Sequence, residues 1–111
     1  MNMRLDPGPF DLIVSGNKNL EIRLFDEKRQ RLNLGDIITF SKRPELIERV
    51  DTLVVALLRY RTIEELVDDI PMEKFGYLHD YDKAEFVKWC YSRYSAEEVK
   101  KYGILGIKIE I

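Results

Sequence analysis

The segment from Gly16 to Arg23 holds the residues whose types and spacing best support chemistry. Apolar side chains at every second position from Leu20 to Leu24 predict a half-buried strand. Residues two apart on a strand share a face, so Glu21 and Arg23 should stand side by side, roughly 7 Å apart, opposite the apolar face. Lys18 leaves the preceding turn and can bend over the same face. The sequence therefore predicts a carboxylate beside two cations.

Such a cluster allows two kinds of chemistry. The cations can bind an anion, or Glu21 can act as a base while Lys18 or Arg23 stabilises developing negative charge. The alternative is a solvated ion pair on an exposed strand, worth well under about 1 kcal/mol. Because structural ion pairs also gather charges, spacing alone does not decide between a site and a surface pair.

Short strands and helices must position this segment. Two capping boxes, Thr62 with Glu65 and Ser95 with Glu98, predict the starts of two helices, and Gly16 is placed to end another. The expected strands cover 3–5, 20–25, 37–40, 50–60 and 104–111, and the expected helices cover 7–14, 62–70, 82–94 and 95–103. About five strands and three or four helices without βαβ regularity predict an α+β fold, a small curved sheet or barrel with helices at its ends.

Length and composition limit the class of protein. A chain of 111 residues is the size of one domain, so we expect a single domain over residues 1–111. One cysteine, Cys90, and one histidine, His79, exclude a disulfide framework, a cysteine metal cage and a multi-histidine site, and no cofactor is implied. No apolar run approaches the roughly 20 residues of a membrane span, and no signal-peptide core is present. We expect a cytoplasmic protein that does not bind a membrane.

The net charge of −2 hides an uneven distribution. Residues 18–31 carry five basic and three acidic side chains, whereas residues 64–85 carry eight acidic and two basic ones. A duplex-binding protein would usually show a basic footprint across a whole face. The pattern is still compatible with a small anionic ligand or a short single strand held at one basic patch. The acidic stretch could alternatively serve a protein–protein interaction.

The order of motifs along the chain resembles the ASCH domain family. The element Gly-x-Lys-x-x-Glu-x-Arg at 16–23 is followed by the turn Leu-Gly-Asp at 34–36. The similarity extends to MRLDPGPFDLI at 3–13, RLFDEKR at 23–29 and YGILGI at 102–107, and so covers essentially the whole chain. The resemblance implies a PUA-like small β-barrel of about five strands with flanking short helices, and an RNA- or nucleotide-related role. Some small family members are amidohydrolases that remove the acetyl group from N4-acetylcytidine, and ribonuclease activity has been proposed for others.

The family's catalytic residues carry over unevenly. Lys18 matches the lysine of the amidohydrolases, but Glu21 occupies the position of their threonine nucleophile. Glu73 is the nearest counterpart of their acidic residue, by loop position. The resemblance therefore implies a protein that binds RNA or a modified nucleoside or nucleotide through Lys18, Glu21 and Arg23. The alternative is a hydrolase, an amidohydrolase or ribonuclease, that uses Lys18 and Glu21 with Glu73 as a possible proton donor.

Further basic residues could extend such a site. Arg4 projects from the outer face of the first strand and could join a basic mouth, or it could simply be solvated. Arg29, together with Lys28 and Arg31, could contact phosphates. The alternative for these three residues is a charged turn that keeps a sheet edge soluble.

Several aromatic residues are ambiguous in the same way. Tyr102 is either a core anchor or a pocket wall. Tyr77 and Tyr81 flank His79 and could stack on a base, although such residues more often close the edge of a core. A site role for His79 is the lesser alternative to a solvated loop residue. Trp89 and Cys90 fall on the apolar side of the 82–94 helix and are predicted to be core.

Overall fold

The fold is built around one five-stranded sheet with the strand order β1-β3-β4-β5-β2. The computed structural model describes residues 1–77 and 80–111. The strands are β1 (Asn2–Leu5), β2 (Leu20–Leu24), β3 (Ile37–Lys42), β4 (Arg49–Tyr60) and β5 (Ile104–Glu110). β1 runs parallel to β3, and the other neighbours are antiparallel. The strand expected over 50–60 is β4, which lies in the middle of the sheet.

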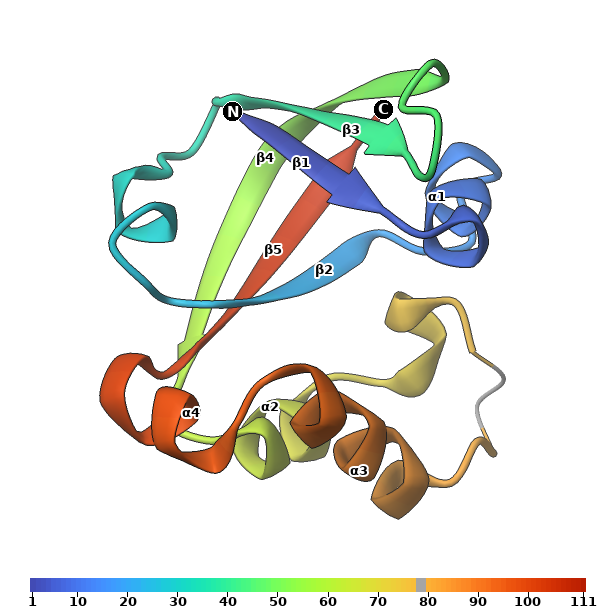
Figure 1. The fold of residues 1–111 in the computed structure, drawn as a ribbon. Helices are drawn as coiled ribbons and strands as arrows, with labels where there is room; N and C mark the ends of the chain where they lie inside the picture. Colours follow the sequence, from blue (N-terminus) through green and yellow to red (C-terminus); the bar gives the residue numbers. More distant parts are fainter. Residues whose placement is uncertain (78–79) are drawn as a thin grey trace.

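The sheet is curled into a half-barrel, with β1 and β2 as its two edges (Figure 1). The concave side is filled by apolar residues from β1, β3, β4 and β5 and from α1 (Pro7–Val14). Phe40, Ile38 and Ile107 are fully buried in this cluster. The observed architecture confirms the expected α+β class, as an open, curled sheet.

Helices cover the sheet on one side and begin where the capping residues predicted. They are α2 (Ile63–Asp69), α3 (Lys83–Arg93) and α4 (Ala96–Tyr102), with 3₁₀ turns η1 (Arg29–Arg31) and η2 (Met72–Phe75). Thr62 caps α2 by accepting from the Glu65 N–H, and Ser95 and Glu98 form the complete capping box of α4. In Figure 1, α2, α3 and α4 lie together below the sheet. No helix in the described part of the chain is long and apolar enough to cross a membrane.

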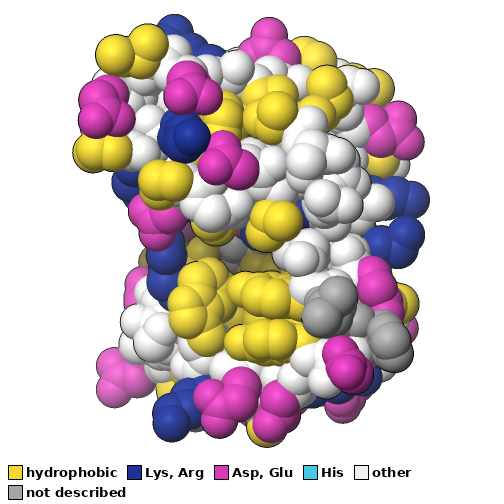
Figure 2. Space-filling view, turned by 90° about the vertical axis from the view of Figure 1, so that its right-hand side faces the viewer, with side chains coloured by type: hydrophobic (Ala, Val, Ile, Leu, Met, Phe, Trp, Pro, Cys, Tyr) yellow, Lys and Arg dark blue, Asp and Glu magenta, His cyan; other side chains and the backbone are white. Residues whose placement is uncertain are grey.

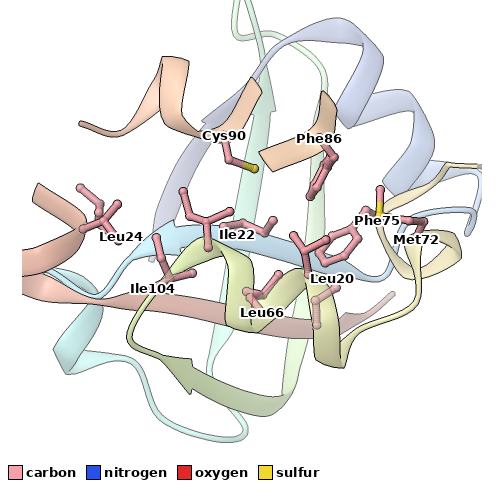
Figure 3. Packing of buried hydrophobic residues seen from close by; sticks show 12 residues of the cluster. Leu20, Ile22, Leu24, Leu66, Met72, Phe75, Phe86, Cys90 and Ile104 are labelled. Carbon is pink, nitrogen blue, oxygen red and sulfur yellow. The ribbon is translucent and has the colours of Figure 1, made fainter. Parts of the chain in front are cut away.

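A second apolar cluster joins β2 to this helical layer. Figure 3 shows Phe86 and Cys90 of α3 lying over Leu20 and Ile22 of β2. Leu24 belongs to the same cluster, so the apolar alternation of β2 faces the helices. One face of β2 therefore packs against the helical layer, and the residues of its other face line the cleft described below.

Trp89, which was expected inside, is exposed, and so is the last residue of α1. Val14, the last residue of α1, is 51% exposed, and only Phe10 and Ile13 of that helix are buried. Trp89 is 46% exposed. Phe86 and Cys90, four residues apart, share the buried stripe of α3, and Trp89 is rotated by about 100° from Cys90 around the helix. The prediction that Trp89 belongs to the core is therefore wrong.

Candidate functional site

Glu21 is a buried carboxylate held between two cations. It is only 5% exposed, although it lies on the face of β2 opposite the apolar alternation. Its Oε1 lies 3.1 Å from Lys18 Nζ, and its Oε2 lies 3.0 Å from Arg23 Nη2. The N–H of Ile22 also donates to Oε1, at 3.2 Å. The curl of the sheet covers this face as well, which excludes a solvated surface pair.

The turn after α1 explains why Lys18 reaches Glu21. Gly16 adopts a positive φ of 82°, which favours glycine, and it reverses the chain at the end of the helix. The N–H groups of Asn17 and Lys18 both donate to the main-chain oxygen of Leu12, at 3.0 Å. The turn is thereby fixed, and the Lys18 ammonium stands over the start of β2.

The charges of this triplet are mutually stabilised. Burial alone would raise the pKa of Glu21, but the Lys18 ammonium and the Arg23 guanidinium outweigh it and hold that pKa below its ordinary value. Burial opposes the charge of Arg23, but the Glu21 carboxylate raises the Arg23 pKa above its usual range. At neutral pH the site therefore holds a fixed carboxylate, which is a good hydrogen-bond acceptor and a weak base.

The triplet lines a cleft of about 220 Å³ between β2, the β1–α1 junction and α3. Aromatic side chains contribute much of the wall: Phe75, Tyr77, Phe86, Trp89 and Tyr94. Figure 2 shows this face hollowed, with apolar side chains gathered beside the hollow and basic side chains at its margin. An apolar cleft with a few convergent polar groups is typical of a small-ligand site.

The aromatic wall is partly open to a ligand. Trp89 stacks on Phe86, with ring centroids 6.1 Å apart and an interplanar angle of 22°. The Arg93 guanidinium lies over the Trp89 ring, 5.5 Å from its centroid. Tyr77 stacks on Tyr81 with centroids 4.5 Å apart. The exposed part of Trp89 therefore belongs to an ordered stack at the cleft.

Nucleophiles are scarce in the cleft. Among the described residues that line it there is no serine, threonine or histidine, and Cys90 carries the one thiol. Burial raises the pKa of that thiol to about 12, so it is neutral and unreactive near pH 7. Tyr94 donates its hydroxyl to the main-chain oxygen of Ile22, at 3.2 Å. These groups favour binding over covalent chemistry.

The other predicted site residues are divided between three places. Arg4 and Arg29 line a groove beside the cleft, and Arg23 is shared by both depressions. Tyr102 lines a separate depression with Arg59 and Lys101. Glu73 is an exposed residue of η2 and is not among the described residues lining the cleft. His79 lies outside the described residues.

The sequence missed several residues that line the cleft. The sequence could have indicated Trp89, because it is the only tryptophan in the chain and follows Phe86 by about one helical turn. Asp6, Arg43 and Arg93 form a small ion cluster in the cleft wall, in which Asp6 oxygens lie 3.3 Å from Arg43 and 3.5 Å from Arg93. These three residues are far apart in the sequence, and no local pattern joins them.

Two features define the class of protein: the half-barrel with its helical layer, and the charged cleft at the sheet edge. A comparison with family models identifies this class. The model of the ASCH domain matches residues 3–111, and the chain belongs to this family. The comparison with curated proteins found no match.

Two solved structures resemble the chain over nearly its whole length. The crystal structure of hypothetical protein PH0355 is 31% identical, with a TM-score of 0.85, and the match covers 98% of this chain and 95% of that one. The solution structure of protein PF0455 from Pyrococcus furiosus is 28% identical, with a TM-score of 0.74, covering 99% and 96%. Both similarities support the fold described above.

Proposed function

We propose that this protein binds a single unstacked nucleobase, carried by RNA or by a modified nucleoside, in the cleft beside Glu21. The observation that carries the proposal is the buried Glu21 carboxylate, fixed by Lys18 and Arg23 in the wall of an aromatic-lined cleft. Its volume of about 220 Å³ lies below the roughly 300–1,000 Å³ of drug-sized sites, which suits a base-sized group. Membership of a family regarded as RNA-binding supports a nucleotide ligand.

The polar groups favour a cytosine-type edge. A carboxylate accepts from an exocyclic amino group, as Glu does from cytosine N4. The neighbouring Lys18 ammonium can donate to a ring nitrogen or carbonyl oxygen. Uracil presents a carbonyl oxygen where cytosine has its amino group, and this oxygen would face the Glu21 carboxylate. A site that hydrogen-bonds an amino group rejects analogues without it, because its own buried groups are left unpaired.

The aromatic wall supplies the sequence-independent part of the affinity. Bases stack on aromatic side chains because every base has a π-face, and each stack is worth about 1–3 kcal/mol. Trp89 is the exposed member of the stack that starts at Phe86. A base that enters beside Trp89 would bring its edge toward Glu21 and Lys18, which line the same cleft.

The hydrolase alternative has less support from the geometry. A general base works best with a pKa near the working pH, whereas the cations hold the pKa of Glu21 below its ordinary value. Burial raises the pKa of Cys90 to about 12, which leaves that thiol protonated. Glu73, the suggested proton donor, is exposed and is not among the described lining residues. These observations support a binding role for Glu21, as an acceptor.

Titration calorimetry with cytidine, N4-acetylcytidine and uridine tests the proposal. We expect cytidine to bind more tightly than uridine by about 1–3 kcal/mol, because only cytidine donates an amino hydrogen to Glu21. The variant Glu21→Ala should lose a similar amount of binding free energy for cytidine. Glu21→Gln keeps a carbonyl oxygen and should lose less, and its unfolding curve shows whether it is folded.

The comparison of bases in the wild-type protein does not depend on any variant folding. Equal affinities for cytidine and uridine, or no binding of any nucleoside, would overturn the proposal. Release of acetate from N4-acetylcytidine that depends on Lys18 would instead establish the amidohydrolase. Arg61→Gln is the matched control, because Arg61 is exposed and lines a different depression.

A further inference from the structure

A strongly basic groove adjoins the cleft on the outer side of β1 and β3. It has a volume of about 530 Å³, and no Asp or Glu is among the described residues lining it. Six of its lining residues are cations: Arg4, Arg23, Lys28, Arg29, Arg43 and Arg49. In a protein with a net charge of −2, this concentration of positive charge is local. Such a surface attracts an extended anion.

The register of the strands builds the floor of this groove. Arg4 of β1 pairs with Ser41 of β3, and Ser41 pairs with Arg49 of β4. Paired residues share a face, so the two arginines flank a hydroxyl and stand about 10 Å apart, two strand spacings. Asp51, two residues further along β4, accepts from Thr39 and marks the acidic end of this row.

Several of these cations have no acidic partner within the described chain. Arg4, Lys28 and Arg49 are exposed and make no ion pair with a described residue. Arg29 is held by Asp26, with Nη1 3.0 Å from Oδ2. Unpaired cations in a row repel one another, and a bound anion relieves that repulsion.

The groove and the cleft adjoin. Arg23 and Arg43 line both depressions, so an anion in the groove and a group in the cleft can belong to one ligand. We infer that the groove binds the phosphodiester backbone of a single nucleic-acid strand whose base occupies the cleft. The statement that a base occupies the cleft rests on the proposed function, whereas the statement that the groove binds phosphates rests on the groove alone. The ligand is then an oligonucleotide, and a free nucleoside fills only half of the site.

A single strand fits the charge distribution better than a duplex. The basic groove is formed by β1, β3 and the start of β4 together with Arg23 and the turn at 28–29, while residues 64–85 carry eight acidic and two basic side chains. A duplex would present phosphates to a broader face. A base can reach the cleft only when it is unstacked, as single strands allow.

Fluorescence anisotropy with a labelled cytidylate octamer tests the inference. The double variant Arg4→Gln/Arg49→Gln removes two unpaired groove cations, and Arg61→Gln/Lys100→Gln removes two exposed cations from another depression. Each phosphate contact to a single strand contributes about −0.7 to the slope of log K against log salt. We expect the groove variant to lose roughly 25-fold in octamer affinity at about 0.1 M salt, and its slope to become shallower by about 1.4. Cytidine affinity should not change.

The outcomes separate the two proposals. Equal octamer affinity for the groove variant and its control would overturn the inference, even if cytidine binds as proposed. A selective loss for the groove variant supports the phosphate site, and in that case failure of cytidine to bind would overturn only the base pocket. An RNA duplex that binds as tightly as the octamer would overturn the single-strand assignment. A deoxycytidylate octamer of equal affinity would support contacts to phosphate, without contacts to the 2′-hydroxyl.

Discussion

The Arg23 guanidinium, on edge strand β2, donates to the main-chain oxygen of Arg4 on edge strand β1, at 3.1 Å. The same Nη2 atom lies 3.0 Å from Glu21 Oε2. Arg23 therefore links the two edges of the curled sheet and also fixes the carboxylate of the candidate site. Fold and site share this residue, so a change at Arg23 should affect stability and binding together.

Arg23→Gln should lower the free energy of unfolding by about 1.5–3 kcal/mol. The change removes hydrogen bonds of a charged group and leaves the buried Glu21 carboxylate with Lys18 as its remaining cation. Urea denaturation measures the loss. Arg61→Gln, at an exposed position outside the site, should stay within about 0.5 kcal/mol of wild type. A loss no larger than that of the control would show that Arg23 does not brace the sheet edges.

Local sequence patterns predicted most elements of the fold. Alternation defined β2, and the side chains of Thr62 and Ser95 defined two helix starts, because these signals act over a few residues. The burial of Glu21 could not be predicted, since it depends on how the sheet curls and on α1 closing the concave side, which Glu21 shares with its strand partner Ile107. The row from Arg4 to Arg49 depends on strand register in the same way.

The buried carboxyl should make stability sensitive to acid. The pKa of Glu21 lies below its ordinary value in the folded protein, so the unfolded chain binds a proton first as the pH falls. The stabilisation is complete above the ordinary value and is lost as the pH falls through the depressed one. The stability advantage of wild type over Glu21→Gln should therefore shrink as the pH falls from about 6 through the ordinary glutamate value and below it. Denaturation curves at several pH values measure it, and a constant difference would contradict this assignment.

The Cys90 thiol should be inert in the folded protein although it borders the cleft. Burial raises its pKa to about 12, and the side chain is 1% exposed. At about pH 8 its reaction with a chromogenic disulfide reagent should be at least about 100-fold slower than that of the same chain in urea. Rapid native reaction would show a thiolate in the cleft, and it would reopen covalent chemistry at this position.

Trp89 should report directly on the occupied cleft. Its indole is the only one in the sequence, is 46% exposed and stacks on Phe86, so a base that stacks beside it should quench its fluorescence. Trp89→Ala should weaken cytidine and octamer binding by about 1–3 kcal/mol, and Trp89→Phe should retain most of the affinity because a smaller aromatic face remains.

Val14→Ala is the control for Trp89→Ala, since it also shortens an exposed apolar side chain, and Val14 does not line the cleft. This control should bind cytidine as wild type does. An unchanged affinity in Trp89→Ala, with no quenching in wild type, would place the base elsewhere. The variant Arg4→Gln/Arg49→Gln separates the two parts of the site. Its Trp89 fluorescence should still be quenched by cytidine, and should be quenched less than in wild type by the octamer at the same concentration. This result would show that different parts of one site hold the base and the backbone.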